Sequence, residues 1–250
     1  MIRYIVKRLL QMIPILLTVA ILIFTLMYFV PGDPVQIMLG DTATPEQVAA
    51  ARASFGLDQP YIIRLWNYLT GIVRLDFGTS YIQGSSVASE LFSRFPRTLL
   101  LSFLSILFTI LVGIPIGIQC AIHANKLSDK IWMFLTMLGN SMPGFWLALL
   151  LVILFSVNLG LLPSNGTGGI EYYILPVVAN SIGSLADIAR QTRSSMLEVI
   201  RSDYVVTARA KGLKEKAVIW KHALPNALIP IITLCGSRFG FMLGGTVIIE

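Results

Sequence analysis

Charged residues are scarce in this sequence. Only 13% of its 250 residues are Asp, Glu, Lys or Arg, whereas a soluble globular domain carries roughly 25%. The chain is instead 55% hydrophobic, with a mean hydropathy of +0.76. This composition excludes an ordinary soluble domain, and it indicates that most of the chain faces lipid or other apolar helices.

Residues that bind metals or act in catalysis are equally few. The two histidines, His123 and His222, lie far apart, each near an expected cytoplasmic membrane boundary. The two cysteines, Cys120 and Cys235, lie inside apolar runs, where thiols usually serve as small buried hydrophobic groups. We therefore expect no metal site and no catalytic cluster, and the cysteines say nothing about the redox compartment.

A phosphate-binding loop is also missing. The pattern Gly-x-x-x-x-Gly-Lys-Ser/Thr occurs nowhere in the sequence, so this chain has no loop of that kind to cradle a nucleotide. We expect neither a cofactor nor an enzymatic activity here, so any energy source must be a partner protein.

Long uncharged runs predict membrane-spanning helices. They occupy residues 9–30, 98–122 and 131–158, and each is long enough to cross a hydrocarbon core of roughly 30 Å. Two further runs, at about 174–195 and 224–249, are interrupted by charged residues. Polar positions of this kind are typical of a pore or of a bundle interior. The sequence thus predicts an all-α polytopic membrane protein, with five spans among these residues.

Lysine and arginine residues set the expected orientation. They gather before the first span, between the second and third, and between the fourth and fifth. Alternating helices place these segments on one side of the membrane, and loops rich in Lys and Arg face the cytoplasm. We therefore assign the formal net charge of +6 to membrane topology, and we expect no nucleic-acid partner.

The segment 31–97 is expected on the opposite, extracytoplasmic side. Within it, Thr44-Pro-Glu-Gln47 is typical of a capping box that starts a short helix, which Gly56 would end. Asp58-Gln-Pro60 would start a second short helix that runs through Trp66.

The predicted topology divides the chain into three parts. Residues 1–30 form an N-terminal cytoplasmic segment and the first span, and residues 31–97 form an extracytoplasmic helical segment. Residues 98–250 form a core domain with the remaining spans, and within it residues 198–222 form a cytoplasmic segment.

Glycine and proline recur inside the expected spans. Gly113 and Gly117 lie in the second span, and Pro143 lies in the third, where we expect it to kink or break the helix. In the fifth span glycines recur at four-residue spacing, at Gly236, Gly240 and Gly244. Such positions favour close helix packing, and the alternative is a hinge or a pore wall.

The most informative stretch is the cytoplasmic one, from Asp203 to Ala227. As a helix, its first part places Thr207, Ala208 and Lys211 on one face. Gly212 is able to take a left-handed conformation that caps this helix and turns the chain. The short side chains here permit the close approach of another protein.

The same stretch resembles the cytoplasmic loop motif of ABC importer permeases. That motif reads Glu-Ala-Ala, three residues, Gly, nine residues, Ile, one residue and Leu-Pro, and this sequence keeps the spacing. At three positions this sequence departs from the motif: Val206 and Thr207 occupy the places of Glu and Ala, and His222 occupies the place of Ile. These departures agree with the peptide and nickel subfamily. In that family the loop forms the coupling helix, which docks in a groove on the ATPase subunit. The resemblance implies that the coupling residues are Thr207, Ala208, Ala210, Lys211, Gly212, Leu224 and Pro225.

The resemblance extends along the whole chain. The segments that carry it are, in order, Pro31-Gly-Asp-Pro34, Phe55-Gly-Leu-Asp-Gln-Pro60, Asp76-Phe-Gly-Thr-Ser80, Ser141-Met-Pro-Gly-Phe-Trp146, Leu162-Pro163, Arg193-Ser-Ser-Met-Leu197 and Gly244-Gly-Thr-Val-Ile-Ile-Glu250. Together they resemble the first of the two permeases in dipeptide, oligopeptide, glutathione and nickel importers. This implies an ABC importer type I transmembrane domain, with about six helices in the family and five covered here. We expect the sixth helix beyond Glu250, which would leave the end of this sequence on the outer side.

A permease of this family implies several partners. They are a second homologous permease subunit, a pair of ATPase subunits, an extracytoplasmic substrate-binding protein and the lipid membrane. The implied location is the bacterial cytoplasmic (inner) membrane, with a multi-pass chain and a cytoplasmic N-terminus. The implied cargo is small peptides, both di- and oligopeptides, or nickel and other metal-chelate complexes, and we favour small peptides slightly.

Polar residues of the last two spans are candidates for the translocation path. Asn180, Ser181, Ser184 and Ser237 would line it, because lipid-facing helices do not carry polar groups cheaply, and the alternative is hydrogen bonding between helices. Arg238 lies too deep for easy snorkelling and needs a partner or water. It either forms a structural pair with Asp187 or acts as a pore-facing cation that favours anionic cargo.

Two other classes of membrane protein compete with this interpretation. An ion-coupled secondary transporter would carry acidic residues near the midplane and often inverted repeats, but the spans hold only Asp187 and no repeat is present. A structural or receptor protein gives no reason for a basic cytoplasmic loop with small residues and Gly212.

Overall fold

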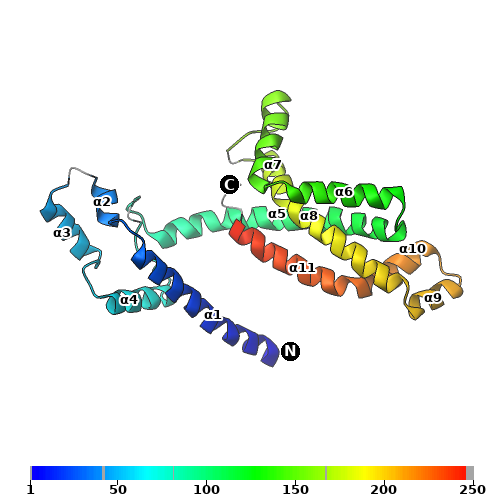
Figure 1. Ribbon diagram of the computed structural model, residues 1–250, viewed down its shortest axis with the longest axis horizontal. Helices are drawn as coiled ribbons and strands as arrows, with labels where there is room; N and C mark the ends of the chain where they lie inside the picture. Colours follow the sequence, from blue (N-terminus) through cyan, green and yellow to red (C-terminus); the bar gives the residue numbers. More distant parts are fainter. Residues whose placement is uncertain (1, 41–42, 81, 167, 246–250) are drawn as a thin grey trace. The chain divides into compact units, whose positions relative to one another are not determined.

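A computed structural model describes residues 2–40, 43–80, 82–166 and 168–245 (Figure 1). The chain divides into two compact units, Met1–Arg94 and Phe95–Glu250. The division falls inside helix α5, Val87–Ile122. Among the described residues the secondary structure is helical, apart from an isolated antiparallel bridge between Thr79 and Ser86. The predicted all-α class is therefore confirmed.

In the described residues of the first unit, one long helix and three short ones precede α5. The long helix is α1, Ile2–Phe29, and the short ones are α2, Pro34–Leu39, α3, Pro45–Ser54, and α4, Tyr61–Val73. Aromatic rings hold α4 against α1, and the hydroxyls of Thr25 and Tyr61 lie 2.7 Å apart.

The predicted capping box at the start of α3 is confirmed. The Gln47 amide donates to Thr44 Oγ1 at 3.3 Å, and the Thr44 amide donates to Gln47 Oε1 at 2.9 Å. The helix ends at Ser54, and Gly56 follows at a φ of +63°, the left-handed conformation that glycine tolerates.

Two features of this unit differ from the expectation. Helix α4 continues to Val73, beyond Trp66, because its amphipathic pattern has no breaker there. Helix α2 was not predicted; Asp33 caps it by accepting from the Val35 amide, and Pro34 fills the first helical position.

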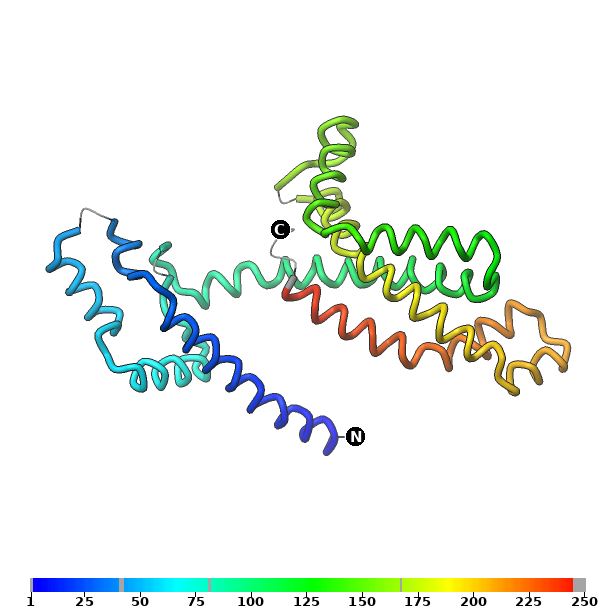
Figure 2. The backbone as a smooth tube through the Cα atoms, in the orientation of Figure 1, coloured from blue at the N-terminus to red at the C-terminus, as the bar shows by residue number. Residues whose placement is uncertain are grey.

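The second unit packs its long helices side by side. After α5 the chain reverses into α6, and α9 and α10 lie together at one end of the unit (Figure 2). The remaining elements are α6 Leu127–Ser141, α7 Gly144–Leu151, the π-helical segment η1 Val152–Asn158, α8 Glu171–Ile200, α9 Asp203–Ala210, α10 Glu215–Ala217, the π-helical segment η2 Val218–Ala223 and α11 Leu224–Gly245.

The described residues contain four helices that are long and apolar enough to span a membrane, or five if one bent pair counts as a span. The bent pair is the predicted third span, which turns by 101° between α6 and α7. The expected break at Pro143 is confirmed, because Met142 before it is extended and proline cannot donate to the helix ladder. The second span begins at Val87 rather than 98, since the charged residues near its start interrupt the hydropathy but not the helix.

Glycines of α5 allow it to pack closely on α8. A Cβ atom at Gly117 would lie 2.4 Å from Thr192 Cβ, and one at Gly113 would lie 3.3 Å from the Leu185 carbonyl oxygen. Close packing is therefore confirmed for these two glycines. The glycine stripe of α11 differs, because within the described part of the chain no atom lies within 4 Å of a Cβ built at Gly236, Gly240 or Gly244.

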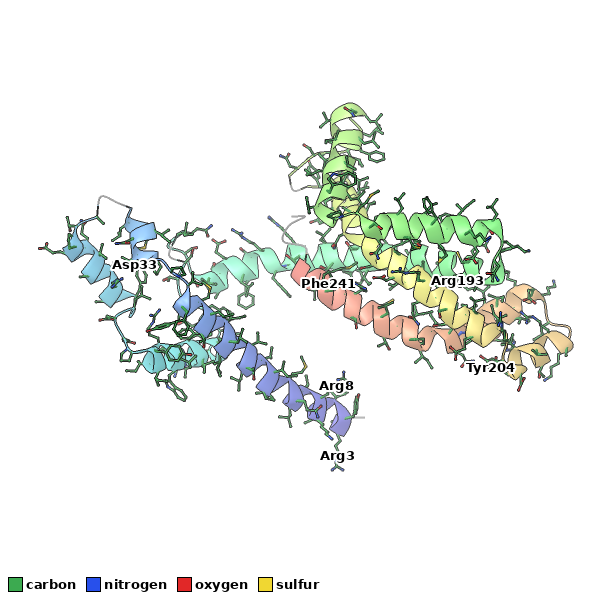
Figure 3. The ribbon with its side chains drawn as sticks, in the orientation of Figure 1. Arg3, Arg8, Asp33, Arg193, Tyr204 and Phe241 are labelled. Carbon is green, nitrogen blue, oxygen red and sulfur yellow. The ribbon has the colours of Figure 1, made fainter. Side chains whose placement is uncertain are left out.

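A buried ion pair joins the start of α6 to α8. Asp129, with 3% of its side chain exposed, accepts from Arg193 Nε and Nη2 at 2.7 Å each. The Asn125 amide also donates to this carboxylate at 2.8 Å. Figure 3 shows Arg193 on α8. The pair fixes α8 against the turn between α5 and α6.

Candidate functional site

A cavity of about 400 Å³ lies within the second unit, between α6, α7, α8 and α11. The break at Pro143 creates room for it, because α7 leaves the line of α6 there. Its polar wall consists of Asn140, Asn180, Ser184 and Arg238. Its apolar wall includes Met142, Phe145, Leu147, Phe241 and Met242. Figure 3 shows Phe241 near the end of α11.

One carboxylate in the cavity region binds two arginines. Arg238 on α11 contacts Asp187 Oδ2, and Arg190 on α8 contacts Asp187 Oδ1. Asp187 keeps 17% of its side chain exposed, against 34% for Arg238 and 43% for Arg190. The structure thus contains the predicted pair of Asp187 and Arg238, and it adds Arg190, which the sequence analysis left out.

The polar candidates of α8 take different positions. Asn180 Nδ2 donates to Ser105 Oγ at 3.2 Å, and Ser181 Oγ donates to the Ser105 carbonyl oxygen at 3.0 Å. These bonds join α8 to α5, which is the alternative that the sequence left open. Asn180 and Ser184 also line the cavity, whereas Ser181 is fully buried between the helices. Ser237 is exposed on α11.

Most of the cavity residues were not among the candidates from the sequence, and Asn140 and Phe145 are examples. Asn140 and Phe145 lie on either side of the break in the third span, and both line the cavity. The nearby Pro143 indicates a break in the span, but it does not indicate the direction in which α7 leaves.

Helix α9 and the turn after it lie within residues 198–222, the stretch for which the sequence predicts a coupling role. The Leu213 amide donates to the Ala208 carbonyl at 3.4 Å, and the Gly212 amide donates to the Arg209 carbonyl at 2.9 Å. With Gly212 at a φ of +76°, this pattern is a Schellman cap. The predicted left-handed glycine is therefore confirmed.

The exposed and buried faces of α9 are distinct. Thr207, Ala210, Lys211 and Gly212 are exposed. Ala208 is only 6% exposed and packs in the core, so the expectation that it shares one surface with Thr207 and Lys211 is wrong. The reason is that successive helical residues point about 100° apart, and the apolar face of α9 takes the alanine inward.

An apolar cluster seats α9 on the ends of the long helices. Val205 and Ala208 of α9 pack there with Met196 of α8 and Val218 of η2. Leu224, at the start of α11, is buried in the same cluster, while its neighbour Pro225 is exposed. A displacement of α9 therefore acts directly on α8 and α11.

Polar contacts also hold α9 in place against the neighbouring elements. Arg209 donates to both carboxylate oxygens of Glu215, with its Nη2 at 2.7 Å, and to the Ile200 carbonyl at 3.3 Å. The hydrogen bond to Glu215 raises the pKa of the Arg209 guanidinium further above its usual value. Asn226 Nδ2 donates to Tyr204 Oη at 2.9 Å, which ties α11 to α9. Tyr204 lies at the start of α9 in Figure 3.

Two family models match the chain over nearly its full length. The model described as binding-protein-dependent transport system inner membrane component matches residues 113–250. A model for the N-terminal part of the membrane component of such systems matches residues 1–102.

Relatives of known name resemble the chain along its whole length. The glutathione transport system permease protein GsiC of Salmonella typhimurium is 42% identical over 250 residues, which are 100% of this chain and 82% of the relative. The protein of the same name from Escherichia coli K12 is 40% identical with the same coverage.

Among solved structures, a chain of the MetNI methionine ABC transporter in an inward-facing conformation matches with a TM-score of 0.53. The match covers 63% of this chain and 72% of that chain at 20% identity. At this identity the likeness shows a shared transmembrane-domain fold.

Proposed function

Since the chain belongs to the family of inner-membrane components of binding-protein-dependent transport systems, we propose that it forms half of the translocation path for small peptides of the glutathione type. Such a subunit is the permease of an ABC importer and lies in the inner membrane. The proposal includes a second homologous permease, a pair of ATPase subunits and an extracytoplasmic binding protein as partners. It also places the N-terminus in the cytoplasm, as the Lys and Arg distribution favours.

Peptide cargo is favoured over a nickel complex by two facts. The relatives that match at 40–42% identity are named for glutathione transport. The cavity also suits a peptide better than a metal complex, because its polar wall offers amide, hydroxyl and guanidinium groups. Within the described residues no group of three or more His, Cys, Asp or Glu is placed to hold a metal ion.

The observation that carries the proposal is the geometry of α9. Its outer face is exposed and includes the small residues Thr207, Ala210 and Gly212, and its inner face packs against α8, η2 and α11 through the cluster around Val205 and Ala208. An ATPase subunit that binds the outer face can therefore move the helices that line the cavity. Coupling residues on this face are Thr207, Ala210, Lys211 and Gly212, with Ala208, Leu224 and Pro225 supporting them from within or from the start of α11.

The test is a substitution at Gly212 in the complete importer. Gly212→Val forces a β-branched residue into the left-handed conformation, a strain of roughly 1–2 kcal/mol, at the surface that docks. We expect ATP hydrolysis to continue while peptide uptake per ATP falls by about tenfold, the equivalent of that strain at the coupled step.

A matched control is available in the first unit. Gly40 has the same φ of +76° and, like Gly212, no atom within 4 Å of an added Cβ. Gly40 has a ψ of 175°, a conformation that side chains tolerate even less than the left-handed helical one, so Gly40→Val strains the backbone outside α9 at least as strongly, and it should leave uptake per ATP unchanged. Normal coupling in Gly212→Val would contradict the role of α9.

A further inference from the structure

The cavity carries one positive charge in excess. Asp187 provides a single negative charge to two guanidinium groups, those of Arg190 and Arg238. In the described parts of α6, α7 and α11, the only acidic residue is Asp129, which is already paired with Arg193. The cluster of Asp187, Arg190 and Arg238 therefore has a net charge of +1.

An unbalanced cation at this depth needs an explanation. Arg238 lies fourteen residues after Leu224, roughly 21 Å along α11, and Asp187 lies near the middle of α8. Charged groups inside a membrane are costly and persist mainly where they face a pathway or a partner. The site is thus poised to accept one anion.

The sharing of Asp187 makes an exchange of partners cheap. Breaking a largely buried ion pair is normally strongly unfavourable, because one charge is left uncompensated. Here each arginine contacts a different carboxylate oxygen, so Asp187 keeps Arg190 when Arg238 leaves. Arg238 has five N–H donors in a planar fork that fits a carboxylate bidentately.

We propose that Arg238 is a specificity-determining residue that leaves Asp187 and binds a carboxylate of the cargo inside the cavity. Arg190 meanwhile holds Asp187, so the filled site contains two ion pairs and no net charge. This inference rests on the proposed function and adds the chemical class of the cargo, an anionic peptide with a free carboxylate.

The rest of the cavity suits such a molecule. Asn140 and Asn180 present amides that pair with peptide groups, and Ser184 adds a hydroxyl. Met142 and Phe145 form an apolar wall for a side chain. The volume of about 400 Å³ falls inside the range of roughly 300–1,000 Å³ typical of small-molecule sites.

The test compares one peptide in two forms, as a free acid and as its C-terminal amide. The amide has nearly the same size as the acid but lacks the negative charge of the C-terminal carboxylate. The complete importer is reconstituted with its partner subunits, and each form is supplied preloaded on the binding protein at equal concentration. We expect wild type to take up the acid in preference to the amide by about tenfold, the worth of one charge-assisted pair.

Variants separate the cargo role from a structural one. Arg238→Gln should bring the acid-to-amide ratio close to one while uptake of the amide persists, and Arg238→Lys should restore part of the preference. Asp187→Asn removes the competing carboxylate, so the apparent KM for the acid should fall. Thr233→Val, also on α11 but outside the cavity wall, should leave the ratio as in wild type.

Each opposing result has a distinct meaning. If wild type moves the acid and the amide equally, the anion that the site accepts is a lipid phosphate or a free ion, and the inference is overturned while the proposed function stands. An unchanged preference in Arg238→Gln overturns it as well. So does a loss of assembly in Arg238→Gln that the double variant with Asp187→Asn repairs, since that is the behaviour of a structural pair. Failure of wild type to move either peptide overturns the proposed function itself.

Discussion

The ion pair of Asp129 and Arg193 offers the sharpest test of what holds the second unit together. The change is Asp129→Asn, which keeps the size of the side chain and removes its charge. The carboxylate accepts three hydrogen bonds, two from Arg193 at 2.7 Å and one from the Asn125 amide at 2.8 Å. An asparagine oxygen in the place of Oδ2 can still accept from the Asn125 amide and from Arg193 Nη2, so the loss is the negative charge and the bond from Arg193 Nε to Oδ1.

The size of the effect follows from burial. Removing one partner of a buried pair costs roughly 3–5 kcal/mol, because the other charge is left without compensation. The Asp129 side chain is 3% exposed, but the Arg193 side chain is 27% exposed. We therefore expect the lower end, about 3 kcal/mol, or about two orders of magnitude in the folding equilibrium.

The measurement is equilibrium unfolding of the purified protein in detergent. Its control is Glu215→Gln, which breaks a contact of the same 2.7 Å length to Arg209, where the side chains are 56% and 36% exposed. An exposed pair contributes only about 0–1 kcal/mol, so this variant should unfold close to wild type.

A double variant separates the pair from the space it fills. Asp129→Leu with Arg193→Met removes both charges, and it should recover part of the loss, since apolar replacement of a buried pair is often neutral. Equal losses in Asp129→Asn and Glu215→Gln would refute the reasoning from burial.

Two further predictions concern α5, α8 and α11. Gly117→Ala should destabilise the protein by about 1–3 kcal/mol, because the added Cβ meets Thr192 at 2.4 Å; Gly236→Ala adds a methyl in open space and should be neutral or stabilising in the same thermal unfolding assay. In a background free of native cysteines, Ser237→Cys should react with a water-soluble thiol reagent during transport, whereas Ser181→Cys, fully buried against α5, should not. Reaction at both positions would contradict the packing of α8.

Much of the fold was predictable because local chemistry determines it. Thr44 and Gln47 form their capping box within one turn, and Gly212 takes its left-handed cap from contacts within five residues. Pro143 breaks the third span for reasons internal to its own backbone. Each of these features needs only the sequence around it, so the sequence was sufficient.

The candidate site was less predictable because it depends on how helices are turned toward one another. The sequence placed Asp187 and Arg238 as a possible pair, but Arg190 lies one turn beyond Asp187 and its role depends on the rotation of α8. Asn140 joins the cavity only because α6 stops before the break. Ala208 turned inward for the same reason, since the apolar cluster and not the motif decides which face of α9 is buried.

The span with the weakest hydropathy signal is the one that carries most of the polar candidate residues. The most apolar stretch of α1 is not buried within the chain at all, whereas 44% of the corresponding stretch of α8, the least apolar of the four long helices, is buried. A polar side chain is tolerated in a span only where other helices or a cavity receive it, so a span with many polar positions has to be well covered. The helix that the sequence predicts least firmly is therefore the one that carries Asn180, Ser184 and Asp187, and its weakness as a hydropathy signal has the same physical cause as its place at the cavity.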